Sequence, residues 1–358
     1  MIRISYLLAA LCCALPAAAQ QQYKIAVIGL VHSHVWGHLN SMVKNDPAKL
    51  VGVAEPIQEL QAEAKKAGVA DNLFYTDYNK MLDETKPDIV WAFVENNRHL
   101  EIVKACAPRK INVIFEKPLA STYKDALAIR DLAKKYDTRV MTNYQMAWWP
   151  ANYTAYAQAK SGEIGDVYRL RGVVGHGGPG SEGPRNKYFF EWLTDPVKNG
   201  AGALMDFGCY NALWSLWYLG RPETVFAQVN SLQPQRFPKV EDNATLVLHY
   251  KNGVGIFEGS WDLPRSFQDL EVFGRKGVVY MQNNKVELRQ GRETKNVPIE
   301  PLPPERSRPI VAMVEAIKTN KPIEGMTALD INIGVIEIID AAKESVKTGK
   351  AVKLGPAK

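Results

Sequence analysis

The chain has 358 residues, of which 46% are hydrophobic and 23% charged, and its formal net charge is +6. The basic residues are spread along the sequence instead of forming runs, so a nucleic-acid partner is not indicated. Beyond the first residues no stretch is long and apolar enough to cross a membrane, and the length suggests two domains, each able to bury a core.

The first 19 residues have the pattern of a secretory signal peptide. Arg3 supplies a positive start, Ile4–Leu15 is apolar, and Ala17–Ala19 forms a small-residue cleavage site. We therefore expect a periplasmic or secreted protein. Removal of this segment leaves Cys106 and Cys209, which could pair, although no cysteine framework demands it.

Strand and helix patterns then alternate as far as about Met146, which predicts a parallel, doubly wound sheet. The expected strands are Lys24–Gly29, Lys49–Glu55, Asp88–Phe93, Val113–Phe115 and Arg139–Met141. The expected helices are one ending near Asn45 and those at Ile57–Ala67, His99–Ala107 and Tyr123–Tyr136.

After Pro150 the hydrophobic period falls to about two, which predicts an antiparallel sheet with one face exposed or used for association. The expected strands are Val167–Val174, Thr224–Ser231, Ala244–Tyr250, Gly253–Trp261, Asp269–Gly274 and Gly277–Met281. The expected helices are Asn152–Ser161, Ile310–Thr319 and Ala328–Thr348. The proline-rich Pro298–Pro309 is expected to be a linker or arm.

The most informative segment is Ile111–Ala120, in which an apolar strand stops at Glu116-Lys117-Pro118. This ending leaves Lys117 at the carboxyl edge of the sheet, where open α/β sheets bind ligands. A partly desolvated lysine beside a carboxylate can hold a substrate hydroxyl or help to move its proton. The alternative is a surface lysine that precedes a loop.

The turn after the first strand, Gly29–His34, has the place of a dinucleotide pyrophosphate site, whose usual pattern is G-x-G-x-x-G. The first glycine is present, but Val31 and His34 occupy the second and third glycine places. Glu55 follows at the end of the second strand, where an acid binds a ribose hydroxyl and repels a 2′-phosphate. It favours NAD over NADP, unless it is a solvated loop acid.

His34 and His38 would share one helical face, a spacing that can bind a metal ion. No further set of histidines and acids supports a metal centre. We therefore expect no metal, and assign these histidines to polar packing or ligand contact.

Another candidate segment is Asn199–Leu213, in which Asp206 and Tyr210 are four residues apart, on one face if the segment is helical. A phenol near a lysine can donate or accept the proton of an alcohol. The alternative is a buried tyrosine and an N-capping aspartate. Nearby His176, Glu191 and Trp192 belong to an aromatic region that could stack on a sugar, or could equally be core or interface.

Together these segments resemble the Gfo/Idh/MocA oxidoreductases. Phe115–Ala120 is similar to the E-K-P segment of that family, and Asp88–Ile102 is similar to its strand and helix, with His99 in the place of a family histidine. Trp192–Pro196 and Gly200–Asn211 resemble the start of its catalytic helix. The resemblance covers almost the whole chain after the signal peptide.

The resemblance implies an α/β fold with two domains. Residues 20–148 would form a Rossmann domain with a doubly wound parallel sheet, and residues 149–358 an α+β domain with an open antiparallel sheet. That sheet would form a homo-oligomer, and the final helices could pack back on the first domain. The implied cofactor is NAD, with NADP less favoured, bound by Gly29, Val31, His32, His34, Glu55, Asn96, His99 and Glu116.

The implied catalytic residues are Lys117, Tyr210 and Asp206, with His176, Glu191 and Trp192 beside the substrate. Lys117 would hold the reacting hydroxyl and lower the pKa of Tyr210, which replaces the family's usual histidine. The expected function is an exported oxidoreductase of a sugar, polyol or glycoside, with a tightly held cofactor. The alternatives are a glycosidase or keto-sugar lyase without net redox change, with or without the dinucleotide, and an inactive sugar-binding protein.

Overall fold

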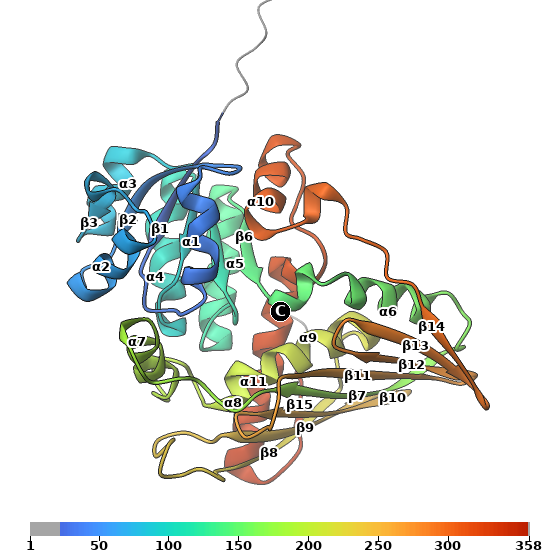
Figure 1. Ribbon diagram of the computed structural model, residues 1–358. Coiled ribbons are helices and arrows are strands. Elements are labelled where there is room, and N and C mark those ends of the chain that lie inside the picture. The colour runs from blue at the N-terminus through green and yellow to red at the C-terminus, as the bar shows by residue number, and fades with distance from the viewer. Residues whose placement is uncertain (1–21, 357–358) are drawn as a thin grey trace, which may run out of the picture.

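The computed structural model describes residues 22–356 and shows two lobes, each built on one β-sheet (Figure 1). The predicted signal peptide and its cleavage site lie outside the described residues. In the part of the chain that is described, no helix is long and apolar enough to span a membrane.

The N-terminal sheet is parallel throughout, in the strand order β3-β2-β1-β4-β5-β6, which confirms the predicted doubly wound arrangement. Its strands are β1 (Lys24–Ile28), β2 (Lys49–Ala54), β3 (Phe74–Tyr75), β4 (Ile89–Ala92), β5 (Asn112–Glu116) and β6 (Val140–Asn143). The order reverses between β1 and β4, and ligands of such sheets bind outside the strand ends at this point.

Helices cover both faces of this sheet because side chains of each strand alternate between two apolar layers. Ala26 and Ile28 face a layer with helices α3, α4 and α5, whereas Ile25 and Val27 face a layer with α1, α2 and α10. These helices are α1 (Val35–Val43), α2 (Gln58–Lys66), α3 (Tyr78–Thr85), α4 (His99–Cys106), α5 (Tyr123–Tyr136) and α10 (Pro309–Lys318).

The second sheet has the strand order β14-β13-β12-β11-β7-β10-β9-β8-β15. Its strands are β7 (Val167–Gly175), β8 (Thr224–Asn230), β9 (Asn243–Tyr250), β10 (Gly253–Ser260), β11 (Phe267–Gly274), β12 (Gly277–Gln282), β13 (Lys285–Gln290), β14 (Glu293–Val297) and β15 (Val352–Lys353). All neighbouring pairs are antiparallel except β7 and β10, so the sheet is mixed at its centre. The sequence analysis did not predict β13, β14 or β15.

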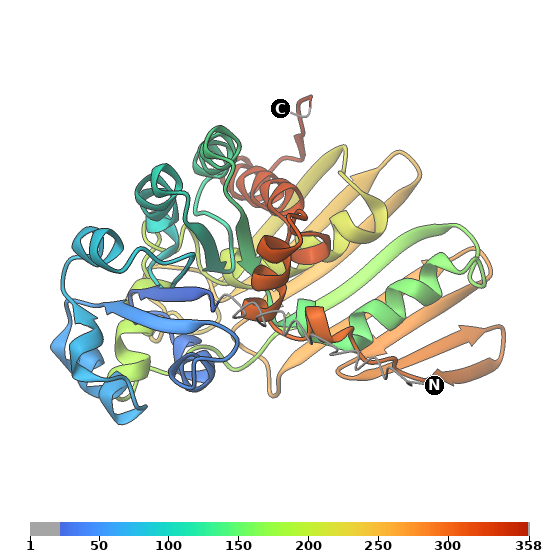
Figure 2. The same ribbon diagram turned by 90° about the horizontal axis from the view of Figure 1, so that it is seen from above.

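One face of the second sheet packs on α6 (Pro150–Lys160), α9 (Gly208–Leu219) and α11 (Leu329–Thr348). The view in Figure 2 shows α11 lying between the two lobes. This helix contacts α5 of the first lobe as well as α9 and β8 of the second. The sequence left open whether Cys106 and Cys209 pair; in the structure both are buried and free.

A helix that the sequence analysis did not predict, α7 (Pro184–Leu193), follows the glycine-rich Gly175–Gly183. It belongs to the second half of the chain but packs against α2 of the first lobe (Figure 1). It therefore lies beside the edge at which β1 and β4 end.

Candidate active site

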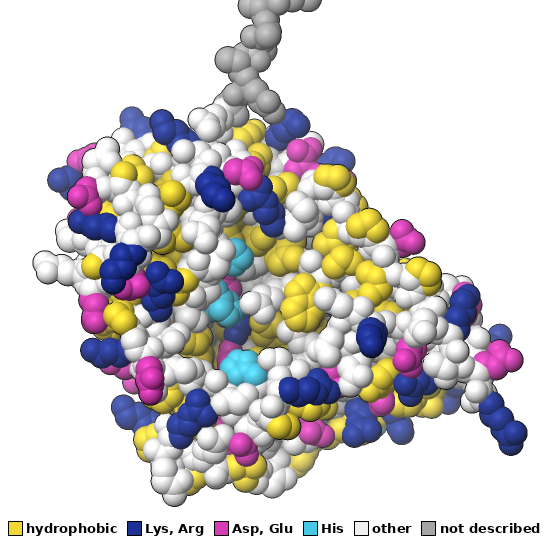
Figure 3. Space-filling view, viewed as in Figure 1, with side chains coloured by type: hydrophobic (Ala, Val, Ile, Leu, Met, Phe, Trp, Pro, Cys, Tyr) yellow, Lys and Arg dark blue, Asp and Glu magenta, His cyan; other side chains and the backbone are white. Residues whose placement is uncertain are grey.

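A cleft of about 410 Å³ separates the carboxyl edge of the first sheet from the second lobe. Histidine side chains gather along this hollow on the face shown in Figure 3. The polar residues that line it are Ser33, His34, Lys117, Gln145, His176, Asn186, Asp206, Tyr210, Ser266 and Gln268, and its aromatic residues include Trp149, Phe189, Phe207 and Phe267.

Lys117 and Asp206 form a buried ion pair at the base of the cleft. The Lys117 ammonium donates to one carboxylate oxygen of Asp206, and the Trp261 indole N–H donates to the other at 2.8 Å. Burial by itself would lower the pKa of Lys117, but the carboxylate of Asp206 raises it above its usual range. Burial likewise works against ionisation of Asp206, and Lys117 holds the pKa of that carboxyl below its usual range. The pair is therefore charged, and Lys117 is a fixed cation.

The segment that holds Asp206 and Tyr210 is helical but is not one regular helix. Helix α8 (Ala203–Asp206) ends and α9 begins at Gly208, with Phe207 between them. The Tyr210 N–H bonds the Phe207 carbonyl at 3.1 Å, and the Asp206 carbonyl accepts from the Cys209 thiol at 3.2 Å and from Lys117 at 3.5 Å. Both side chains still face the cleft.

Tyr210 lies directly beside the lysine, with the Lys117 Nζ 5.3 Å from the centre of the phenol ring. Burial raises the pKa of Tyr210, and the nearby Lys117 charge opposes this without overcoming it. The net direction is opposite to the one implied by the resemblance. Tyr210 is therefore a neutral phenol at neutral pH, whose hydroxyl can donate a hydrogen bond to a ligand in the cleft.

His176 faces the same cleft from the end of β7. Its Nδ1 accepts a hydrogen bond of 2.9 Å from the Gly178 N–H, which puts the proton of the neutral ring on Nε2. Burial lowers the pKa of His176, so the ring is uncharged at neutral pH. It is a hydrogen-bond donor toward a bound ligand.

The turn after β1 retains features that fit a dinucleotide. Gly29 has a φ of +77°, and a Cβ there would lie 2.6 Å from Val94, so this position requires glycine. Within residues 22–356, no hydrogen bond is found to the backbone N–H of Val31 or of Ser33. Free amides at a strand-to-helix turn suit a pyrophosphate. We conclude that the turn fits the group despite the missing second and third glycines.

Glu55 is buried and is not a solvated loop acid. One carboxylate oxygen accepts from the Leu30 N–H at 2.7 Å and the other from the Ile57 N–H at 2.8 Å. Burial raises the pKa of Glu55, although these two bonds oppose the change. Glu55 therefore holds the turn in place, and each oxygen keeps a lone pair for a ribose hydroxyl.

Asn96 and His99 are buried under the sheet edge and do not line the cleft. The Asn96 amide donates to the Asn199 side chain at 2.7 Å, which links the two lobes. His99 is stacked on Phe115 and its Nδ1 donates to the Leu119 carbonyl at 3.0 Å. They position the loops around Lys117 and are not placed for ligand contact.

Helix α7 brings Trp192 to the turn after β1 and leaves Glu191 outside the site. The Trp192 indole donates to the Val31 carbonyl at 3.1 Å, and its ring lies 5.4 Å from that of His32. Glu191 is exposed and does not line the cleft. Of the three predicted substrate residues, only His176 lines the cleft.

His34 and Glu116 meet across the sheet edge, where His34 Nδ1 lies 2.8 Å from Glu116 Oε2. Glu116 is buried, and its second oxygen accepts from the Asn143 amide at 2.7 Å. His32 lies beneath α7, with its Nδ1 accepting a long 3.3 Å bond from the His34 N–H.

Two residues important for this site were not identified from the sequence, namely Trp261 and Asn143. Trp261 follows β10, 55 residues after the aspartate that it contacts, and Asn143 ends β6, 27 residues after Glu116. Both stand at strand ends next to the cleft. A polar or indole side chain at the end of a predicted strand was the signal available for them.

Comparison with protein families matches both halves of the chain. Residues 23–144 match the oxidoreductase family with an NAD-binding Rossmann fold, and residues 154–280 match the GFO/IDH/MocA C-terminal domain.

Known proteins with similar sequences include sugar and polyol dehydrogenases. A D-xylose 1-dehydrogenase (NADP+) of Haloferax volcanii is 27% identical over 82% of this chain and 89% of its own length. A myo-inositol 2-dehydrogenase of Thermotoga maritima is 26% identical over 73% of this chain and 75% of its own length.

Solved structures share the fold. An aldose–aldose oxidoreductase of Caulobacter crescentus, complexed with glycerol, has a TM-score of 0.79 and 20% identity over 93% of this chain and all of its own. An inositol dehydrogenase homologue of Azotobacter vinelandii, complexed with NAD+, has a TM-score of 0.78 and 19% identity over 94% of this chain and 98% of its own.

Proposed function

Since this chain belongs to the Gfo/Idh/MocA family of NAD(P)-dependent oxidoreductases, we propose that it acts outside the cytoplasm on a hydroxyl group of a neutral sugar, polyol or glycoside. The observation that carries the proposal is the buried Lys117–Asp206 pair, which faces a cleft beside Tyr210 at the edge of the Rossmann sheet. The signal-peptide pattern supports export.

Within this proposal Lys117 orients the substrate and Tyr210 handles its proton. Lys117 remains protonated, so it donates a hydrogen bond to the reacting oxygen and does not act as a base. Tyr210 gives a proton to that oxygen when a carbonyl is reduced. For alcohol oxidation the neutral phenol must first lose its own proton to solvent, and the resulting phenolate then takes the proton of the hydroxyl. In the second direction the Lys117 charge stabilises the phenolate. Asp206 and Trp261 position the lysine.

The dinucleotide would be held by the Gly29–His34 turn and by Glu55, and when bound it supplies the hydride donor or acceptor. The position of Glu55 favours NAD over NADP because a carboxylate repels a 2′-phosphate. Helix α7, anchored to Val31 and α2, supports slow exchange of the cofactor. Retention suits an exported enzyme, for which free NAD would be scarce.

The cleft lining supports a neutral substrate. Among the described residues that line it, Lys117 is the only lysine or arginine and Asp206 is the only acid, and the two neutralise each other. The remaining walls offer neutral donors, acceptors and aromatic faces, a combination that suits sugar rings. The similarity to xylose and inositol dehydrogenases points to the same substrate class.

Mass spectrometry of denatured, natively purified protein tests cofactor retention, and a panel of sugars, polyols and glycosides tests the reaction. We expect a released dinucleotide and a keto product. Lys117→Ala and Tyr210→Phe should each lower kcat by about 10²-fold or more, whereas Glu191→Gln, on the exposed side of α7, should retain activity. Activity that survives both site variants would contradict these roles.

A redox-neutral glycosidase or lyase is a second candidate, favoured by the His34 and His176 imidazoles in the cleft. Cleavage of a glycoside without accumulation of a keto product would favour the glycosidase or lyase over the oxidoreductase.

A further inference from the structure

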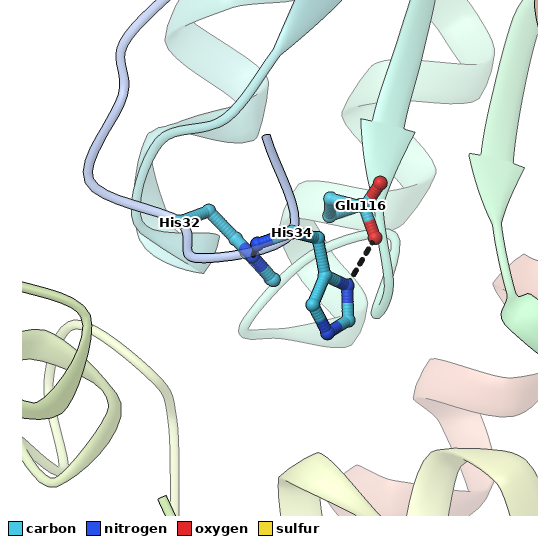
Figure 4. A group of neighbouring side chains, drawn as sticks. All are labelled: His32, His34 and Glu116. Atoms are coloured by element: carbon cyan, nitrogen blue, oxygen red, sulfur yellow. Dashed lines mark hydrogen bonds and ion pairs between the residues drawn. The ribbon is translucent and has the colours of Figure 1, made fainter. Parts of the chain in front are cut away.

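We propose that His32, His34 and Glu116 form a binding site for one divalent transition-metal ion, with Zn²⁺ the best match, at the edge of the cleft. Figure 4 shows the two imidazoles, from the turn after β1, next to the carboxylate at the end of β5. This goes beyond the proposed function, and can be tested without a substrate or a dinucleotide.

The distances are close to those that a metal ion needs. One candidate ligand atom from each residue lies within 4.8 Å of the other two, and His34 Nδ1 and Glu116 Oε2 are 2.8 Å apart. Zinc bonds of about 2.0–2.2 Å place tetrahedral ligand atoms roughly 3.4 Å apart. Zinc binding would require the His32 ring to move closer, which releases its long bond from the His34 N–H. It would also displace the proton that His34 Nδ1 and Glu116 share.

The chemistry of the donors selects the ion. Two imidazole nitrogens and one carboxylate oxygen are typical ligands of zinc and other transition metals, whereas magnesium and calcium prefer oxygen. Three protein ligands leave one position open, and His34, with 25% of its side chain exposed, lies in the cleft wall. That open position is available to water or to a substrate oxygen.

The surroundings hold Glu116 in place, as the supporting groups of metal ligands do. Its side chain is 1% exposed, and its second oxygen accepts from the Asn143 amide at 2.7 Å. The Asn143 carbonyl oxygen in turn accepts from the Trp148 indole at 2.6 Å. A carboxylate fixed in this way keeps one oxygen directed at the two imidazoles.

The local charges permit a cation. The N-terminus of α1 contributes only about half a positive charge, which the full negative charge of Glu116 outweighs. The charge of Lys117 is balanced by Asp206. Imidazoles bind a metal ion only in their deprotonated form, so two of them and one carboxylate give a ligand set of net charge −1 for a dication.

The test is titration of chelator-treated full-length protein with ZnCl₂ by isothermal calorimetry, and measurement of bound zinc by mass spectrometry. We expect one Zn²⁺ per chain. His34→Ala and Glu116→Gln should each raise the Kd by at least about tenfold, and Asn143→Ala by roughly 10- to 100-fold. His249→Gln, at an exposed histidine of β9, is the matched control and should bind as the natural chain does.

Thermal unfolding keeps the test independent of folding defects. Zinc should raise the Tm of the natural chain and of His249→Gln, but not that of Glu116→Gln, whose Tm in chelator should match the natural one. The proposal is overturned if the natural chain binds no zinc, if His34→Ala and Glu116→Gln bind zinc normally, or if His249→Gln abolishes binding.

Discussion

At the residue scale, the central feature of the cleft is a buried ion pair. Desolvation of the two ions costs free energy, and removal of one partner costs more. Lys117 and Asp206 are 5% and 6% exposed, and each is stabilised in its charged form by the other. Such a pair contributes little net stability, but removing one partner leaves an uncompensated buried charge. What the pair provides is a fixed cation at the base of the cleft.

Lys117→Met is expected to lower the free energy of unfolding by about 3–5 kcal/mol, because Asp206 is left buried and unpaired. Adding Asp206→Asn removes that charge and should recover a substantial part of the loss. Urea unfolding followed by tryptophan fluorescence measures both values. Strictly additive losses in the two single variants and the double variant would show that the pair is not coupled.

At the element scale, α7 differs most from what the sequence indicated. Its stretch, Pro184–Leu193, follows a glycine-rich loop and has no clear amphipathic pattern. In the structure it covers the turn after β1, with Tyr188 bonded to Glu59 at 2.7 Å and Arg185 bonded to Glu63 at 2.8 Å. These polar contacts fix the position of α7 against α2, and the local sequence alone does not specify the helix.

Tyr188→Phe combined with Arg185→Met should loosen α7 without unfolding the protein. Both contacts are screened by solvent and each contributes little, so the loss of the two together should make opening of α7 roughly a few times more frequent. Amide hydrogen exchange of α7 would rise accordingly, and a retained dinucleotide would leave faster. Glu191→Gln on the same helix is the matched control. Equal exchange rates in both variants would show that these contacts do not anchor α7.

At the scale of the whole molecule, burial of histidines makes stability depend on pH. His99 is completely buried, and desolvation lowers its pKa to about 4, although the Leu119 carbonyl and Glu116 act in the opposite direction. Burial also lowers the pKa of His32, His38 and His176. Below pH 6.5 the unfolded chain binds protons that the folded chain excludes, so stability falls as the pH falls.

The contribution of His99 should be about 3 kcal/mol, lost between pH 6.5 and pH 4. His99→Asn can retain a donor toward the Leu119 carbonyl but cannot be protonated in this range. Its free energy of unfolding should therefore fall less steeply than that of the natural chain. The matched control His249→Asn should retain the natural slope. Urea titrations at a series of pH values give these slopes, and parallel curves for His99→Asn would contradict the assignment.

The open face of the second sheet remains the predicted homo-oligomer surface. Its strands alternate buried and exposed residues, and Ile256 of β10 is 38% exposed on that face. Export and oligomerisation stay predictions that sedimentation and fractionation of cells would test.

The sequence alone determined the parallel sheet and the position of Lys117 at its carboxyl edge, because short apolar strands and their ends are encoded locally. Tyr210 and Asp206 could be identified from four-residue spacing and the family resemblance. The sequence did not determine which side chains these residues contact. Trp261, Asn143 and α7 reach the site from distant segments, and only their packing decides what they contact.

The same holds for charge and protonation. Lys117 is recognisable in the sequence, but its lasting charge follows from burial beside Asp206, and the neutral state of Tyr210 follows from burial that outweighs Lys117. From the sequence, His32 and His34 are expected to contact the dinucleotide or to pack against polar groups, with no metal ion. Only the tertiary structure places Glu116 beside them. Strand β4 lies between β1 and β5 in the sheet, so the contact spans the end of β4 and cannot be read from neighbouring strands. Local sequence specifies where strands end. The burial of the side chains at those ends, and therefore their charge states, is decided only when distant segments pack together.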